Sequence, residues 1–324
     1  MVEALPITGT FIGEIQASYE IPDQNWSDAV WDADFAAMKA AGIDTAIIIR
    51  CGVKKKLLYP SEWLMKNAGC ERPRRDKLQL FFKLAEKHGI KLWIGGYYSG
   101  NDWMLATYDV QKEMEHMKRS FAEIWENYAK NSPAFGGWYL SQETGAPTAY
   151  NVFECYKQVG AFCHDLSGHQ TLISPGISGC NNGSLTSKYP PAACRRIAAT
   201  PDEHREMWGN VLDYVKGSVD IVAFQNSQVN RDTQMREFLK VNYDVVTANG
   251  MIPWTNIETF ELETSLRTFP PISFDCLLDK LEWAQQAGFQ KAITYEFSHF
   301  MSPNACAMAA RNLYGLYMDY FCKK

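Results

Sequence analysis

Four glutamates stand at or just beyond the end of a short apolar run, which is an unusual place for a carboxylate. They are Glu14, Glu143, Glu258 and Glu296. Because glutamates are rarely fully buried unless they are paired, one alone would be interpreted as a rim salt bridge or a helix cap. Four at equivalent places in the pattern favour a catalytic or binding site.

Two carboxylates that work without a metal are what glycoside hydrolysis requires. One carboxylic acid protonates the leaving oxygen, while an ionised carboxylate attacks the anomeric carbon or activates water. Amides and aromatic rings accompany the four glutamates, and both suit a sugar, whose ring has apolar faces and a hydroxylated edge. We expect substrate contacts from Glu14, Tyr98, Trp103, Gln142, Gln225, Trp254, Asn256, Glu296 and His299.

The glutamates must be positioned by the apolar runs that precede them. Each run is short and does not alternate strictly, as expected for parallel strands that are covered on both faces. The eight runs span residues 7–14, 45–52, 91–100, 136–143, 170–178, 220–228, 251–260 and 291–300.

Amphipathic helical patterns separate these runs. One begins at a capping Ser27 and ends at Gly42, and others end at Gly89 and Gly288, which are typical start and stop signals of helices. Eight strands that each precede a helix predict an α/β fold, namely one closed (β/α)8 TIM barrel over residues 1–324. A doubly wound open sheet is the alternative, but no glycine-rich phosphate loop follows the first run.

The connections differ in length on the two sides of this predicted barrel. Helix-to-strand connections are short, whereas strand-to-helix connections are long after the first, second, third and fifth strands. In such barrels the active site lies on the face where strands end and these long loops gather. The irregular residues therefore point to a functional face at the strand ends.

The composition of the chain limits the kinds of binding partner and the cellular compartment that we expect. The chain has 324 residues and a net charge of -5, and its basic cluster around Lys54–Lys56 and Arg72–Arg75 is short, so we expect a solvated loop and no nucleic-acid partner. No apolar run approaches the length of a membrane span. The first residues lack a signal-peptide pattern, and nine cysteines without a CxxC motif favour free thiols in the cytoplasm. A secreted protein whose leader had been removed would look the same.

No metal or other cofactor is expected, since the six histidines are scattered without ligand spacing. The expected partner is an oligosaccharide or glycoside substrate, and the sequence leaves the oligomeric state open.

The motifs are similar to those of the retaining glycoside hydrolases of clan A, a large group of (β/α)8 barrels. More closely, the chain resembles a family of uncharacterised glycosyl-hydrolase-like barrels common in gut bacteria and catalogued as a domain of unknown function. The resemblance rests on "GTFIGEI", "QNW", "MKAAGIDTAII", "WYLSQE", "DIVAFQNS", "NIETF" and "EFSHFMSP", which follow one another along nearly the whole chain.

This resemblance implies roles for individual residues. In clan A the acid/base glutamate ends the fourth strand and the nucleophile ends the seventh, which are the places of Glu143 and Glu258. The clan carries asparagine directly before the acid/base, whereas this chain has Gln142. The sixth-strand motif has Gln225-Asn226 where Gln-Asp is expected. Glu296 is a rival for either catalytic role, because it ends its strand in the same way as Glu258.

Two other functions remain open at this point. A carbohydrate-binding barrel without turnover would keep the amides and aromatics but hold the glutamates too far apart. A sugar isomerase or lyase would use one glutamate as a base, together with a metal or a Schiff-base lysine.

Overall fold

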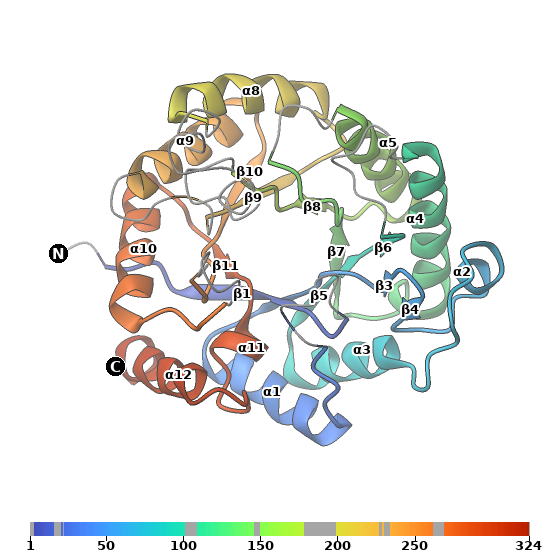
Figure 1. Cartoon of the computed structure of the whole chain (residues 1–324), viewed down its shortest axis with the longest axis horizontal. Helices are drawn as coiled ribbons and strands as arrows, with labels where there is room; N and C mark the ends of the chain where they lie inside the picture. Colours follow the sequence, from blue (N-terminus) through green and yellow to red (C-terminus); the bar gives the residue numbers. More distant parts are fainter. Residues whose placement is uncertain are drawn as a thin grey trace, which may run out of the picture.

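Eight parallel strands close into a barrel in this structure, a computed structural model that describes residues 3–15, 21, 23–100, 109–145, 150–177, 199–226, 229, 234–261 and 269–323. Around the barrel the order is β1-β11-β10-β9-β8-β7-β5-β2 (Figure 1). The strands are β1 (Ile7–Ile12), β2 (Thr45–Ile48), β5 (Lys91–Gly95), β7 (Phe135–Tyr139), β8 (Thr171–Ile173), β9 (Ile221–Gln225), β10 (Ile252–Asn256) and β11 (Ala292–Thr294). Each overlaps one predicted run, so the predicted (β/α)8 fold is confirmed.

Helices form a ring outside these strands (Figure 1). They are α1 (Asp28–Ala40), α3 (Lys77–His88), α4 (Val110–Ile124) with its π-helical continuation η1 (Trp125–Ala129), α5 (Tyr150–Ser167), α8 (Pro201–Tyr214), α9 (Met235–Ala248), α10 (Phe274–Ala287) and α12 (Met308–Phe321). In the described part of the chain, none of them has the length and apolarity that a membrane crossing demands.

The helix ends follow the signals in the sequence. Ser27 accepts a hydrogen bond from Val30 N at the start of α1, and Asp76 does the same for Gln79 N at the start of α3. Gly89 ends α3 in the left-handed conformation with φ 64°, where the absence of a Cβ removes a steric penalty. These caps fix where each helix leaves the strand before it and turns towards the next.

Apolar side chains pack in two layers. The inner cluster fills the barrel, while a much larger one lies between the strands and the helices and includes Trp31, Phe81 and Trp138. The inner cluster consists of Phe11, Ile47, Ile49, Trp93, Tyr139, Leu172, Ile221, Ala223 and Ile293, with Trp254 and Tyr295 packed against it. Because successive side chains of a strand face opposite sides, these residues identify the inward-facing positions of every strand.

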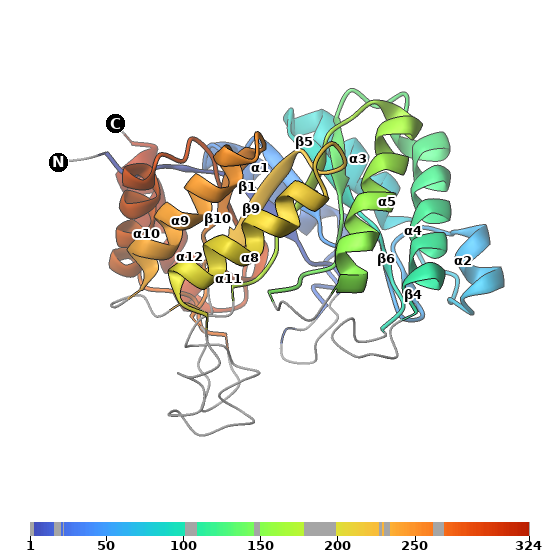
Figure 2. The same ribbon diagram turned by 90° about the horizontal axis from the view of Figure 1, so that it is seen from above.

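Further short elements gather at the ends of the strands. After β2 the chain forms β3 (Gly52–Val53), β4 (Lys56–Leu57) and α2 (Glu62–Asn67), and β6 (Tyr97–Tyr98) completes a small sheet in the order β4-β3-β6. The helix α11 (Phe297–Phe300) follows β11. Figure 2 shows β4 and β6 on the side of the barrel that faces away from the C-terminus.

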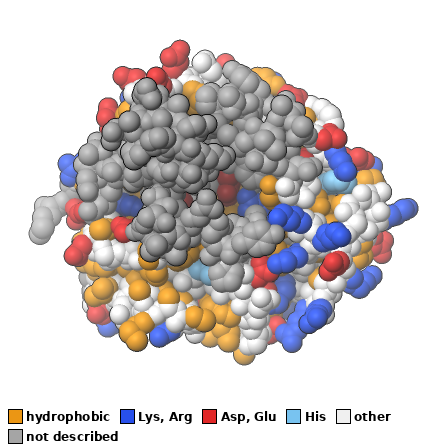
Figure 3. Space-filling view, viewed as in Figure 1, with side chains coloured by type: hydrophobic (Ala, Val, Ile, Leu, Met, Phe, Trp, Pro, Cys, Tyr) orange, Lys and Arg blue, Asp and Glu red, His pale blue; other side chains and the backbone are white. Residues whose placement is uncertain are grey.

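The predicted basic loop lies in this region, where Figure 3 shows Lys and Arg side chains over the part of the face that contains β3, β4 and α2. Lys56 pairs with Asp23, and Arg75 pairs with Asp28 at 3.2 Å. All three of Lys56, Arg75 and Asp28 are largely exposed, so these pairs add little to stability.

Candidate active site

The inward-facing side chains change from apolar to polar as the strands end. On β7 the inward Tyr139 is followed by Ser141 and Glu143, and on β10 the inward Trp254 is followed by Asn256 and Glu258. The barrel interior therefore ends in a polar layer at the mouth, as in barrels whose active sites lie at this face.

Glu143 is held by donors on both carboxylate oxygens. Tyr139 donates its hydroxyl to Oε1 at 2.9 Å, and the guanidinium of Arg50 lies 3.4 Å from Oε2. The carboxylate remains partly accessible, with 23% of its side chain exposed. Burial, with the nearby charge of Glu143, raises the pKa of Tyr139 well above its ordinary value, so Tyr139 stays a neutral hydrogen-bond donor at physiological pH. Glu143 is thus fixed in orientation yet open to a ligand.

Arg50 is a site residue that the sequence analysis did not single out. It follows β2 and is only 5% exposed. It donates to the carbonyl of Ser141 at 3.1 Å, and it lies over the ring of Tyr98 with 5.6 Å to the ring centroid. The structure therefore brings the predicted Tyr98 next to Glu143 through this arginine. A charged residue directly after the apolar run "TAIII" was the signal that could have identified Arg50.

Glu258 is buried, with 3% of its surface exposed. The backbone N–H of Asn226, just after β9, donates to its Oε2 at 3.1 Å. Beside it, Asn256 donates to Ser174 Oγ at 3.1 Å, and Gln225 donates to the carbonyl of Ser174 at 2.8 Å. The predicted Gln225, Asn256 and Glu258 therefore come together at the ends of β8, β9 and β10.

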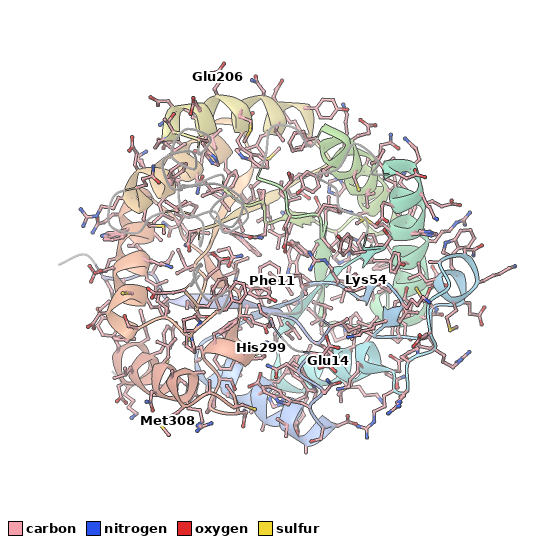
Figure 4. All side chains as sticks on the ribbon, viewed as in Figure 1. Phe11, Glu14, Lys54, Glu206, His299 and Met308 are labelled. Atoms are coloured by element: carbon pink, nitrogen blue, oxygen red, sulfur yellow. The ribbon has the colours of Figure 1, made fainter. Side chains whose placement is uncertain are left out.

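Glu296 and His299 form a pair at the start of α11. The backbone N–H of Gly13 donates to Glu296 Oε2 at 2.6 Å, and Glu296 Oε1 contacts Nδ1 of His299. Glu296 is completely buried, and the His299 side chain is 10% exposed. Figure 4 shows His299 at the edge of the barrel mouth beside α11. Glu296 thus fixes the imidazole ring and has little access to a ligand of its own.

Glu14 faces away from the barrel interior. Its carboxylate pairs with Lys77 at 2.9 Å and accepts a hydrogen bond from Trp31 Nε1 at 3.2 Å, and both partners belong to the surrounding helices. Burial raises the pKa of Glu14, although Lys77 and Trp31 oppose that rise. Figure 4 shows Glu14 near α3 while Phe11 lies inside the barrel. The expected substrate contact from Glu14 is not supported by this position.

Gln142 also lies outside the barrel interior. Its amide nitrogen is 2.9 Å from Met117 Sδ on α4, its carbonyl accepts from Tyr156 on α5, and it is 1% exposed. Because Glu143 faces inward, the preceding side chain must face the helices. Gln142 therefore does not occupy the place of a sugar-binding amide beside Glu143.

Trp254 lies at the opposite end of the barrel from the mouth. Its ring contacts Trp93 at 5.6 Å between centroids, and Lys291 lies over it at 5.1 Å. Lys291 precedes β11 and pairs with Asp44, which precedes β2, so this ring marks the end where strands begin. The expected substrate contact from Trp254 is not supported by this position. Trp103, which was also expected to contact the substrate, falls outside the described residues.

Within the residues that the structure describes, no three His, Cys, Asp or Glu side chains are grouped as they would be around a metal ion. The mouth instead offers carboxylates, amides, hydroxyls and one guanidinium. This set suits the recognition of hydroxyl groups together with proton transfer by carboxylates.

Comparison with known proteins places this geometry in context. The family described as a domain of unknown function (DUF4434) matches residues 7–307. A crystal structure described as that of a "putative alpha-L-fucosidase" from Bacteroides thetaiotaomicron VPI-5482 is 40% identical in sequence. It superimposes with a TM-score of 0.89 over 99% of this chain and 94% of that one. No curated protein is significantly similar to the chain.

More distant structures share the fold. One is an endo-1,4-beta-D-mannanase from Thermotoga petrophila RKU-1, with 12% identity, a TM-score of 0.58, and coverage of 90% of this chain and 88% of that one. Another is an intracellular xylanase from Thermoanaerobacterium saccharolyticum JW/SL-YS485, with 12% identity, a TM-score of 0.52, and coverage of 90% and 85%.

Proposed function

This chain belongs to the DUF4434 family, and from that premise we propose that it is a glycoside hydrolase that uses Glu143 and Glu258. The observation that carries the proposal is the pair of inward-facing carboxylates at the ends of β7 and β10. Each has an oxygen held by a fixed donor, Tyr139 for Glu143 and the Asn226 N–H for Glu258. The structure described as that of a "putative alpha-L-fucosidase" supports the same class of reaction.

The proposed mechanism retains the configuration at the anomeric carbon. Glu258 attacks that carbon as a carboxylate, while Glu143 gives its proton to the glycosidic oxygen and the leaving group departs. A covalent glycosyl ester on Glu258 results. Water then attacks the same carbon, Glu143 takes a proton from it, and the ester bond breaks to restore Glu258. No cofactor takes part in either step.

Arg50 holds Glu143 in place for both steps of the proposed reaction. Its guanidinium is buried and lies 3.4 Å from Glu143 Oε2, while Tyr139 donates to Oε1. The carboxyl group of Glu143 therefore keeps one orientation when it donates the proton and when it accepts one.

The oligosaccharide or glycoside would meet the polar layer at the mouth. Gln225 and Asn256 would contact hydroxyls of the sugar near Glu258, and Tyr98 would contact the sugar from the side of Glu143. His299 is oriented by Glu296, and its imidazole would donate a hydrogen bond to the sugar, or accept one from it, from the side of α11. Glu14, Gln142 and Trp254 contribute to the fold instead, since their side chains lie away from the mouth.

The test is turnover of a panel of aryl glycosides that includes α-L-fucosides and the common α- and β-hexosides and pentosides. Glu143→Gln and Glu258→Gln should each lower kcat/KM by at least ~100-fold, as for the loss of a general acid or nucleophile. Glu126→Gln, an exposed carboxylate paired with Lys130 on the outside of the barrel, is the matched control and should keep full activity.

Azide should restore turnover to Glu143→Ala and yield a glycosyl azide, because a small nucleophile replaces the missing base in the second step. If the wild type turns over a substrate and neither glutamine variant is impaired, the proposal is overturned. Binding of sugars without turnover across the whole panel would favour a carbohydrate-binding barrel.

A further inference from the structure

The helix α11 is too short to hold its own position at the barrel mouth. It comprises only Phe297–Phe300, and among the described residues no side chain caps its start. The first turn of a helix fixes several backbone angles for a single hydrogen bond, so a helix of this length is unstable in isolation. The place of His299 at the mouth (Figure 4) therefore depends on contacts that the segment makes with the rest of the barrel.

The start of the segment is tied to the ends of two strands. Thr10 Oγ1, on β1, accepts a hydrogen bond from the backbone N–H of Phe297 at 2.9 Å. Thr259 Oγ1, after β10, donates to the carbonyl of Glu296 at 3.1 Å. Together with the bond from Gly13 N to the Glu296 carboxylate, these contacts fix the first residues of the segment.

A single buried carboxylate holds the rest of the segment from the side of the helices. Ser298 donates to Asp34 Oδ2 at 2.8 Å, and Ser302 donates to Asp34 Oδ1. The side-chain amide of Asn304 donates to the same Oδ1 at 3.3 Å. Asp34 belongs to α1, so one residue near the start of the chain gathers three donors from α11 and the turn that follows it.

Both serines belong to the stretch "EFSHFMSP" (Glu296 to Pro303), which also carries the glutamate and the histidine of the mouth. Ser298 and Ser302 are completely buried, so they are not themselves open to a ligand. His299 directly follows Ser298, and a shift of this serine would therefore move the imidazole as well. Glu296 fixes the ring of His299, and Asp34 fixes the backbone that carries the ring.

A carboxylate is an unfavourable choice for packing at this place. Asp34 is fully buried, and burial raises its pKa to about 6 in spite of the hydrogen bonds that it accepts. The other buried residues of α1 are Trp31, Phe35 and Met38, and an apolar side chain at position 34 would avoid the desolvation of a charge. Packing alone does not explain the aspartate, whereas three directed bonds to the segment that carries His299 do.

We propose that Asp34 is a positioning residue that holds His299 at the barrel mouth through its bonds to the α11 segment. The inference rests on the proposed glycoside hydrolase function, in which His299 binds a hydroxyl of the sugar. Asp34 is completely buried and therefore acts on the sugar only through His299. Without its carboxyl group the segment is free to shift, and the imidazole is less often in the position that meets the sugar.

The experiment compares Asp34→Ala, Asp34→Asn and His299→Ala in two measurements. The first is the affinity for free L-fucose, D-galactose, D-glucose and D-mannose by titration calorimetry, and the second is kcat/KM on any aryl glycoside that the wild type turns over. Asp34→Ala should weaken binding of the preferred sugar and lower kcat/KM by about 10-fold, because His299 is displaced. Asp34→Asn keeps the size of the side chain and an acceptor oxygen, so it should stay within about threefold of wild type.

The double variant Asp34→Ala/His299→Ala gives a readout that a purely structural role would not change. Per folded molecule, its affinity and kcat/KM should equal those of His299→Ala alone, because Asp34 acts through His299. If Asp34→Ala does not fold, Ser302→Ala takes its place in the same comparison. It removes one donor and keeps the carboxyl group, and its loss should be about threefold in the presence of His299 and absent without it.

Asn242→Ala is the matched control for the loss of a buried polar contact. Asn242 on α9 is 2% exposed, and its Oδ1 lies 2.8 Å from Nε2 of His204 on α8, in a part of the barrel that does not carry His299. This variant should have a lower unfolding temperature than wild type, and its affinity for sugar should be unchanged.

The outcomes separate the two proposals. Equal affinity and kcat/KM in folded Asp34→Ala and wild type, or a loss that is just as large in the absence of His299, overturns the inference and leaves the glycoside hydrolase intact. Weaker sugar binding by Asp34→Ala and His299→Ala without turnover by any variant supports the inference and overturns the hydrolase. Failure of the wild type to bind or turn over every one of these compounds overturns both.

Discussion

Arg50 and Glu143 lie 3.4 Å apart at the mouth of the barrel, although β2 and β7, whose ends they follow, are separated by β5. The arginine is almost completely buried. Its Nη2 also donates to the carbonyl of Ser141, and among the described residues its Nε has no hydrogen-bond partner. A buried guanidinium whose paired carboxylate is exposed to the mouth is an arrangement that serves a reaction more than it serves stability.

The first prediction concerns this pair. Arg50→Ala should lower kcat/KM by about 100-fold, because Glu143 loses the cation that fixes the position of its carboxylate. In the double variant Arg50→Ala/Glu143→Gln the loss should be close to that of Glu143→Gln alone, since the two residues act as a unit. Arg75→Ala removes an exposed pair with Asp28 and is the control. Additive losses in the double variant would contradict the assignment.

The second prediction distinguishes Glu14 from the catalytic glutamates. Lys77→Met leaves Glu14 buried without its cation, which should reduce the free energy of unfolding by about 3 kcal/mol. The double variant Lys77→Met/Glu14→Gln removes the buried charge as well and should recover part of that loss. In both, kcat per folded molecule should stay within about threefold of wild type. A 100-fold loss of kcat in a fully folded Glu14→Gln variant would instead place Glu14 in the reaction.

The third prediction is a pH dependence of stability that arises from Asp34. This residue of α1 is fully buried and accepts hydrogen bonds from Ser298 at 2.8 Å, from Ser302 and from Asn304 at 3.3 Å. Burial raises its pKa from 3.8 to about 6. Because the folded state binds the proton more tightly than the unfolded chain, stability from this group is highest below pH 3.8 and falls as pH rises through 6.

Denaturant unfolding of wild type and Asp34→Asn at several pH values measures this effect. The wild-type free energy of unfolding, relative to that of Asp34→Asn, should fall by about 2 kcal/mol between pH 4 and pH 7. Ser298→Ala keeps the carboxyl group and should therefore keep the pH dependence. A wild-type minus Asp34→Asn difference that stays constant with pH would refute the prediction.

The fourth prediction uses two glycines as a matched pair. A Cβ added at Gly95, the last residue of β5, would lie 2.1 Å from the carbonyl oxygen of Ile49 and 2.5 Å from that of Ile48. Backbone atoms cannot yield easily, so Gly95→Ala should destabilise the fold by more than about 3 kcal/mol or prevent folding. At Gly209 in α8 the nearest atom is 3.9 Å away, and Gly209→Ala should stabilise by about 0.5–1 kcal/mol. Thermal unfolding of both variants checks the contrast, and equal effects would contradict it.

The strands and the barrel were predictable because their signals are local. Eight apolar runs separated by capped amphipathic patterns leave few alternatives, and helix ends such as Ser27, Gly89 and Gly288 lie where the sequence indicates them. The face on which the site lies also follows from the positions of the glutamates at the ends of runs.

The direction of each side chain was not predictable in the same way. Strands of a parallel barrel are apolar on both faces, so the pattern does not show that Glu14 and Gln142 face the helices while Glu143 and Glu258 face the interior. Alternation within "WYLSQE" means that Gln142 and Glu143 face opposite sides of the barrel wall, but it does not say which of the two faces the interior. The inner cluster around Phe11 and Tyr139 identifies the inward-facing side chains and so decides between them.

The sequence also does not show how far along the barrel axis each inward-facing side chain lies. Trp254 is inward-facing, yet its ring lies against Lys291 at the end where strands begin, because its strand reaches the mouth only at Asn256 and Glu258. Arg50 was missed for a different reason. Its importance comes from its contact with a glutamate that follows another strand, and such contacts between distant segments leave no periodic pattern.

The measurement that tests the central claim most directly is covalent labelling of the nucleophile. A 2-deoxy-2-fluoro glycoside of the preferred sugar, with a good leaving group, slows breakdown of the glycosyl ester more than its formation, since the fluorine destabilises the positive charge that develops in both steps. Mass spectrometry of the digested protein should then find the sugar on the peptide that contains Glu258, and Glu258→Gln should not be labelled. A label on Glu143 or Glu296, or no label from a sugar that the enzyme turns over, would contradict the account.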